Sequence, residues 1–251
     1  MIVVTGPGRS GTSFLAALYR ELGFDPGGRW EPAVDAGLED RELVRLNLAV
    51  ARAMGVSIRE RRGGRVLESL GTLVRASDGR VPVALRRPFV AAADALRYLR
   101  STPDLMDWAS VDPVVGRFGD QMRAMAKERA VVKDPRFCFT LRAWLASGAP
   151  VEAVVFTIRP LDAMADSRVR VRMYSGRARE WARHNYCYGI GLLMTAVAEH
   201  RVPLTQLRYP DFLEQPEALH ALLPLPEPRS WPEFEAAFRA VYDPSLVHDR
   251  R

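Results

Sequence analysis

The sequence predicts a three-layer α/β fold, in which helices flank both faces of a central parallel sheet. Short apolar runs with the β-branched content of buried strands recur along the chain, and helical stretches separate them. The first of these runs leads through a glycine-rich turn directly into a helix. Strands that alternate with helices favour an α/β fold with a parallel sheet. The length of 251 residues suits one domain, and we expect a single domain over residues 1–251.

Four segments have the composition of strands buried in a parallel sheet. They are residues 2–5, 130–133, 151–158 and 203–209. The second and third segments are each followed by a proline and then by helical periodicity.

Helical stretches fill most of the remaining chain. The first, residues 12–22, is stopped by Gly23. The others lie near residues 39–54, 89–100, 115–127, 161–174, 177–200 and 230–241. Residues 55–88 are rich in glycine and arginine and only weakly periodic. We interpret this segment as an irregular insertion or lid on the same domain, with a solvated connector as the alternative.

The composition excludes several classes of protein. No apolar run approaches the roughly 18–20 residues of a membrane-spanning helix, so we expect no membrane insertion. Lysine and arginine total 36 against 30 acidic residues, and only Lys127 and Lys133 are lysines. This arginine bias reflects either a GC-rich genome or an anionic ligand. The arginines are spread along the chain without a basic tail, so we expect no nucleic-acid partner.

The N-terminus carries no basic region ahead of an apolar one, and the chain has only two cysteines, Cys138 and Cys187. We therefore expect a cytoplasmic protein. Both cysteines are expected to pack as small apolar groups. No cluster of histidine, cysteine and aspartate has the spacing of metal ligands, and we expect no metal.

A glycine-rich loop between the first strand and the first helix is the main candidate for chemistry. Its sequence is Gly6-Pro7-Gly8-Arg9-Ser10-Gly11-Thr12-Ser13. Glycines let the backbone curl around an anion, and the first N–H groups of the helix point toward it. The spacing imitates a Walker A loop, but Thr12 stands where that loop has its lysine. With Arg9 as its cation, the loop indicates a phosphate-bearing donor other than ATP.

Three motifs resemble those of sulfotransferases that use 3′-phosphoadenosine-5′-phosphosulfate (PAPS). The run from Arg9 to Ser13 resembles their 5′-phosphosulfate loop, in the arginine version of the protein-tyrosine and carbohydrate branches and of many bacterial relatives. Arg159, at the end of a predicted strand, and Ser167, eight residues later, resemble their 3′-phosphate motif. The strand end around Lys133, Val131-Val132-Lys133-Asp134-Pro135-Arg136, resembles that of tyrosine sulfotransferases and bacterial members.

The resemblance implies a P-loop fold, an enzyme, and a role for each matched residue. Arg9 and Lys133 would stabilise charge on the sulfuryl oxygens and the departing 5′-phosphate. Arg159 and Ser167 would hold the 3′-phosphate. The residues expected to bind PAPS, and to retain the product 3′-phosphoadenosine 5′-phosphate, are Gly8, Arg9, Ser10, Gly11, Thr12, Ser13, Arg159 and Ser167. The Arg-Lys-Gly loop of the cytosolic branch is missing near the C-terminus.

Sulfuryl transfer to a hydroxyl also needs a base for the acceptor's proton. All four histidines lie beyond Ser167, whereas cytosolic sulfotransferases have theirs between the two phosphate motifs. Glu31, which stands 22 residues after Arg9, is our first candidate, and Glu39 and Asp40 are its rivals. The spacing of Glu31 is similar to that of the base glutamate in the tyrosine and heparan branches.

The acceptor is not encoded in a recognisable motif. We expect a small molecule or a carbohydrate, such as a bacterial natural product, as the hydroxyl-bearing partner. The sequence is also compatible with two other functions. A small P-loop kinase would use ATP and magnesium with Asp134 as a Walker B acid, and a non-catalytic relative would only bind the nucleotide.

Overall fold

The computed structural model describes residues 1–8, 10–27, 39–54, 111–172 and 176–243. Its sheet has four strands in the spatial order β2-β1-β3-β4, and every neighbouring pair is parallel. The strands are β1 (Ile2–Thr5), β2 (Val131–Lys133), β3 (Ala153–Ile158) and β4 (Leu204–Arg208). The predicted α/β class with a central parallel sheet is therefore confirmed. All four strands fall within the segments predicted for them.

Helices surround this sheet. They are α1 (Thr12–Glu21), α2 (Arg41–Ala53), α5 (Val111–Glu128), α6 (Phe137–Ala146), α7 (Leu161–Arg172), α8 (Gly176–His200), α9 (Pro216–Leu222) and α10 (Trp231–Val241), with a short 3₁₀ helix, η2 (Asp211–Leu213). Helix α6 confirms the periodicity expected after Pro135, but α9 was not predicted, because seven residues are too short for a periodic signal. Helix α5 begins four residues earlier than predicted, since Pro113 is tolerated in a first turn. The predicted helix at 89–100 and the insertion at 55–88 lie outside the described residues.

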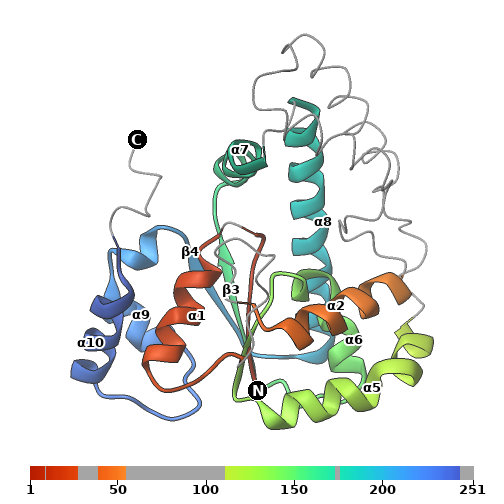
Figure 1. Ribbon diagram of the computed structural model, residues 1–251, viewed down its shortest axis with the longest axis horizontal. Helices are drawn as coiled ribbons and strands as arrows, with labels where there is room; N and C mark the ends of the chain where they lie inside the picture. The colour runs from red at the N-terminus through yellow and green to blue at the C-terminus, as the bar shows by residue number, and fades with distance from the viewer. Residues whose placement is uncertain (9, 28–38, 55–110, 173–175, 244–251) are drawn as a thin grey trace, which may run out of the picture.

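Two cores, one on each face of the sheet, make the three layers. Along β1, Val3 faces one core while Ile2 and Val4 face the other, as the period of two in a strand requires. The core around Val3 is built with α2, α5, α6 and α8, and the core around Val4 is built with α1, α9 and α10. Figure 1 shows these two groups of helices on opposite sides of the sheet.

The topology defines the edge of the sheet at which a ligand can bind. From β1 the chain passes to β2 on one side and then returns to β3 on the other side of β1. In open parallel sheets, ligands bind at the carboxyl ends of strands where the order reverses in this way. Here that point lies between β1 and β3. We call the side on which all four strands end the carboxyl edge.

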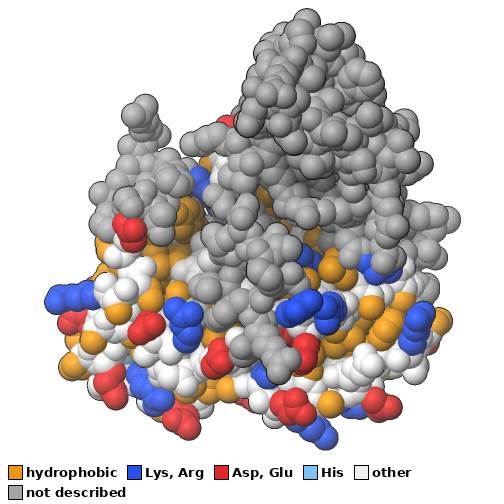
Figure 2. All heavy atoms as spheres, viewed as in Figure 1, with side chains coloured by type: hydrophobic (Ala, Val, Ile, Leu, Met, Phe, Trp, Pro, Cys, Tyr) orange, Lys and Arg blue, Asp and Glu red, His pale blue; other side chains and the backbone are white. Residues whose placement is uncertain are grey.

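One face of the molecule carries side chains of both charges. On the face shown in Figure 2, basic and acidic side chains are mixed over the described part of the chain. No helix among the described residues has both the length and the apolar character needed to cross a membrane.

Candidate active site

The glycine-rich loop (residues 6–11) leaves β1 at the carboxyl edge and leads directly into α1, as predicted. Gly11 has φ of +90°, and a Cβ atom there would lie 2.5 Å from the Tyr209 ring. A Cβ atom on Gly6 would lie 2.4 Å from the Thr157 carbonyl oxygen, so the loop runs directly against β3. The buried Ser10 hydroxyl is 2.8 Å from the Thr157 hydroxyl and fixes the loop to that strand. A side chain at Gly6 would collide with Thr157 and a side chain at Gly11 with Tyr209, so both positions require glycine.

The N-terminus of α1 adjoins the glycine-rich loop. Its N-cap is Gly11, which makes no side-chain capping hydrogen bond. The first N–H groups of a helix have no partner within the helix and carry its positive dipole end. Thr12 and Ser13 supply the first two of these groups. The order of strand, glycine-rich loop and helix is the one that the sequence predicted, while Arg9 lies outside the described residues.

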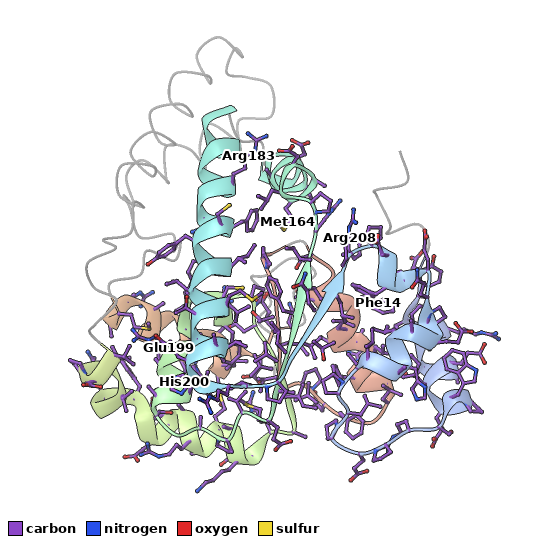
Figure 3. The ribbon with its side chains drawn as sticks, turned by 180° about the vertical axis from the view of Figure 1, so that it is seen from behind. Phe14, Met164, Arg183, Glu199, His200 and Arg208 are labelled. Atoms are coloured by element: carbon purple, nitrogen blue, oxygen red, sulfur yellow. The ribbon has the colours of Figure 1, made fainter. Side chains whose placement is uncertain are left out.

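Tyr186 of α8 was not anticipated from the sequence. Its hydroxyl donates a 2.9 Å hydrogen bond to the carbonyl oxygen of Gly8 and so ties a distant helix to the loop. Helix α8 is in turn joined to α7 by hydrogen bonds from Arg183 to Asp162. Figure 3 shows Arg183 and Met164 between these two helices. No local pattern could have indicated Tyr186, because it contacts a residue 178 positions away.

Lys133 lies beside the loop because β2 pairs with β1 and ends at the same edge. Its side chain is buried, with 1% of the residue exposed. The ammonium nitrogen lies 3.5 Å from the Ser13 hydroxyl and 3.2 Å from Oε1 of Glu39. The structure therefore places a cation from β2 beside Ser13 in the first turn of α1.

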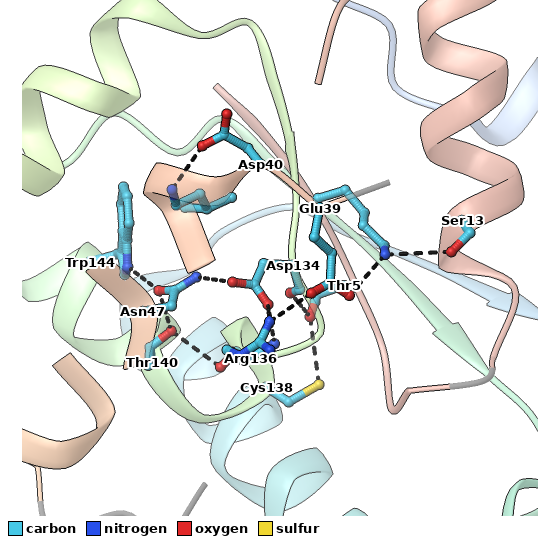
Figure 4. Close-up of polar contacts among 12 residues, drawn as sticks. Thr5, Ser13, Glu39, Asp40, Asn47, Asp134, Arg136, Cys138, Thr140 and Trp144 are labelled. Atoms are coloured by element: carbon cyan, nitrogen blue, oxygen red, sulfur yellow. Dashed lines mark hydrogen bonds and ion pairs between the residues drawn. The ribbon is translucent and has the colours of Figure 1, made fainter. Parts of the chain in front are cut away.

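Glu39 stands just before α2 and bridges two cations. Arg136 donates a 2.7 Å hydrogen bond to Oε2 of Glu39 and a 2.9 Å bond to Oδ1 of Asp134. The other carboxylate oxygen of Asp134 accepts a 2.9 Å bond from the side-chain amide of Asn47. We refer to Lys133, Glu39, Arg136, Asp134 and Asn47 as the Lys133 network, and Figure 4 shows its bonds.

The network is anchored in the core of the protein. The amide oxygen of Asn47 accepts hydrogen bonds from the indole of Trp144, at 2.9 Å, and from the hydroxyl of Thr140, at 2.8 Å. All three residues are fully buried. The sequence singled out the charged members of the network, but Asn47, Thr140 and Trp144 carry no recognisable motif and were not predicted.

Burial and charge pairing shift the pKa values of the network in identifiable directions. Burial lowers the pKa of the Lys133 ammonium, and the Glu39 carboxylate opposes that effect. Burial alone would raise the pKa of Glu39, but Lys133 and Arg136 outweigh it and hold that pKa below its usual range. A carboxylate with a lowered pKa is a weak proton acceptor. The geometry therefore suits Glu39 as an anion between two cations better than as a general base.

Glu31, the first candidate for that base, lies outside the described residues. Gly27 and Asp40, which stand on either side of its segment, lie close together: a Cβ atom on Gly27 would lie 2.4 Å from the Cβ of Asp40. The Asp40 carboxylate accepts a 2.8 Å bond from the N–H of Leu43 and so caps α2. This cap fixes the position of Glu39, the preceding residue.

Arg159 follows β3 at the carboxyl edge and is also buried. Its guanidinium carbon lies 5.3 Å from the centre of the Tyr209 ring, in cation–π geometry. The same ring packs against Gly11, so Tyr209 lies between the predicted 3′-phosphate arginine and the glycine-rich loop. Ser167 is buried on α7, about two turns after the helix begins.

The two cysteines differ. Cys138 is buried, and burial raises the pKa of its thiol to about 12. Cys187 is exposed, so the prediction that it packs as an apolar group is wrong. Its position on α8, one residue after the buried Tyr186, turns its side chain away from the core. Among the described residues, no group of three or more histidine, cysteine, aspartate or glutamate side chains is arranged to hold a metal ion.

Comparison with known proteins gives one similarity. No protein-family model matches the chain, and no curated protein matches it. The crystal structure of the sulfotransferase STF1 from Mycobacterium tuberculosis H37Rv is similar to it, with 17% sequence identity and a TM-score of 0.45. The similarity covers 96% of this chain and 71% of that one. At this identity and TM-score, the likeness does not assign an activity to this chain.

Proposed function

We propose that this protein transfers a sulfuryl group from PAPS to a hydroxyl of a small-molecule or carbohydrate acceptor. The observation that carries the proposal is the position of the Lys133 ammonium beside Ser13 at the N-terminus of α1. The glycine-rich loop lacks a Walker lysine, and β2 supplies a buried cation in its place. A phosphate at the helix N-terminus and an adjoining sulfuryl group both need positive charge of this kind.

In this proposal, two groups of residues bind the two phosphate-bearing ends of PAPS. Backbone N–H groups from Gly8 to Ser13, with the hydroxyls of Ser10, Thr12 and Ser13, would bind the 5′-phosphate. Arg159 and Ser167 would bind the 3′-phosphate. The contact of the Tyr209 ring with both Arg159 and Gly11 supports a single nucleotide that spans the two sites.

In the reaction, the acceptor oxygen forms a bond to sulfur while the bond from sulfur to the 5′-phosphate oxygen breaks. Lys133, with Arg9, would stabilise the charge that develops on the sulfuryl and phosphate oxygens. Glu31 would take the acceptor's proton. The products are the sulfated acceptor and 3′-phosphoadenosine 5′-phosphate.

The Lys133 network argues against a kinase. A magnesium-dependent kinase would use Asp134 as a metal ligand, but the carboxylate is fully buried and bonded through one oxygen to Arg136 and through the other to Asn47. Thr12 in the place of the Walker lysine points in the same direction.

The test is calorimetric titration with 3′-phosphoadenosine 5′-phosphate. We expect saturable binding that is lost in Arg159→Ala and retained in Arg142→Ala, a control arginine on α6 that pairs with Glu199. A parallel assay offers the protein radiolabelled PAPS or ATP with magnesium and a panel of hydroxyl compounds. Label transfer from ATP, with no binding of 3′-phosphoadenosine 5′-phosphate, would replace this proposal with the kinase.

A further inference from the structure

Glu39 and Asp40 are adjacent acids with different partners. Asp40 caps α2 and pairs with Arg129 at 2.8 Å, so its carboxylate serves the backbone of the helix. Glu39 instead directs its carboxylate to Lys133 and Arg136. Both acids are almost completely buried. Burying a carboxylate costs desolvation free energy unless charged partners compensate it. A buried carboxylate beside Lys133, a candidate catalytic residue, therefore needs an explanation.

The carboxylate of Glu39 gives one oxygen to each cation. Oε1 lies 3.2 Å from the ammonium of Lys133, and Oε2 lies 2.7 Å from the guanidinium of Arg136. The shorter bond holds the carboxylate on Arg136. Asp134 accepts a second bond from Arg136, and Asn47 donates to the other oxygen of Asp134. Because Arg136 also pairs with the carboxylate of Glu39, this carboxylate orients the Lys133 ammonium without fully neutralising its positive charge.

A lysine needs such orientation because its side chain has four flexible bonds. Fixing a free lysine side chain in one conformation costs conformational entropy. A catalytic cation is most effective when this cost is met before the transition state forms. The charged groups around the ammonium are Glu39, which precedes α2, and Asp134 and Arg136, which follow β2.

We propose that Glu39 is the positioning residue for Lys133, holding its ammonium at the nucleotide's 5′ end, with Arg136, Asp134 and Asn47 as its support. This inference rests on the proposed function, and it assigns to Glu39 a role other than that of the general base.

A double-mutant cycle tests whether Glu39 acts through Lys133. The variants are Glu39→Gln, Lys133→Met and their combination, and the readout is the dissociation constant of 3′-phosphoadenosine 5′-phosphate. We expect Glu39→Gln to weaken binding about tenfold, the effect of losing one charge-assisted interaction. In the Lys133→Met background, the same change should have almost no effect. Glu199→Gln, which removes an ion pair at the far end of α8, is the matched control and should bind as the wild type does.

Tighter binding in Glu39→Gln would overturn the inference, because it would mean that the carboxylate merely repels the anion. Equal losses in both backgrounds would also overturn it, since Glu39 would then act independently of Lys133. Absence of binding to the wild type would instead refute the proposed function.

Lysine-selective NMR labelling provides a second measurement, since the chain contains only Lys127 and Lys133. Lys127 is exposed and serves as the internal reference. We expect the nucleotide to shift only the Lys133 signal, and Glu39→Gln to lower the pKa of Lys133 but not that of Lys127.

If Glu39→Gln does not fold, Glu39→Asp replaces it. This variant keeps the carboxylate charge but shortens the side chain, so we expect weaker binding and a smaller change in the pKa of Lys133. An unchanged dissociation constant and an unchanged pKa in Glu39→Asp would overturn the inference.

Discussion

Replacing Gly11 by alanine should destabilise the protein through two separate effects. Gly11 has φ of +90°, a conformation that costs residues with a Cβ atom about 1–2 kcal/mol. The new Cβ atom would also lie 2.5 Å from Cδ2 of Tyr209 and 3.1 Å from Phe212. Overpacking of this kind costs about 1–3 kcal/mol. We therefore expect Gly11→Ala to lower the free energy of unfolding by about 2–5 kcal/mol.

Gly148 provides a control that separates the two effects. It follows α6 with φ of +77°, and its Cβ atom would meet nothing within 4 Å. Gly148→Ala should therefore cost only the backbone part, about 1–2 kcal/mol. The difference between the two variants measures the collision with Tyr209.

Urea unfolding followed by tryptophan fluorescence gives both free energies, provided that the m-value is unchanged. We also expect Gly11→Ala to lose binding of 3′-phosphoadenosine 5′-phosphate, because the collision displaces either the start of α1 or the ring beside Arg159. Equal destabilisation by the two substitutions, together with unaltered nucleotide binding in Gly11→Ala, would refute this account of the loop.

Three further predictions concern other parts of the site. Tyr186→Phe removes the donor to the Gly8 carbonyl and should lower the free energy of unfolding in urea by about 0.5–1.5 kcal/mol; an unchanged value would mean that the bond contributes nothing. Glu31→Gln should leave nucleotide binding intact and reduce turnover by about 10²–10⁴, whereas unchanged turnover would remove Glu31 as the base. A disulfide reagent at pH 8 should modify Cys187 rapidly but leave Cys138 unmodified until the protein unfolds, because the raised pKa keeps that thiol protonated. Mass spectrometry of peptides would identify the modified cysteine, and rapid labelling of Cys138 would contradict its burial.

Local sequence patterns were sufficient for the strands and most helices of this fold. Residues 2–5 form β1 as predicted: a short run of apolar or β-branched residues followed by a glycine-rich turn is typical of a strand buried on both faces. The third strand begins two residues later than predicted. There the N–H of Val151 bonds to the carbonyl of Ala149, in a turn rather than in the ladder. Hydrophobicity alone does not distinguish such a turn residue from a strand residue.

The candidate site was predictable only where its residues follow strands. Lys133 ends β2 and Arg159 follows β3, the two strands that flank β1 in the parallel sheet, so their position at one edge follows from the topology. Lys133 pairs with Glu39, and Asp134 pairs with Asn47; both partners lie nearly a hundred positions away in the sequence. Their pairing depends on how α2 packs against α6, which no spacing within either segment specifies.

The hydrogen bond between Tyr186 and Gly8 has a thermodynamic consequence for the long helix α8. Since this bond joins the helix to the loop, a compound that stabilises the position of α8 through this bond would, under the proposed function, strengthen the binding of the nucleotide's phosphate at the loop. Reciprocity of linked equilibria then requires the anion to strengthen the attachment of that compound by the same factor.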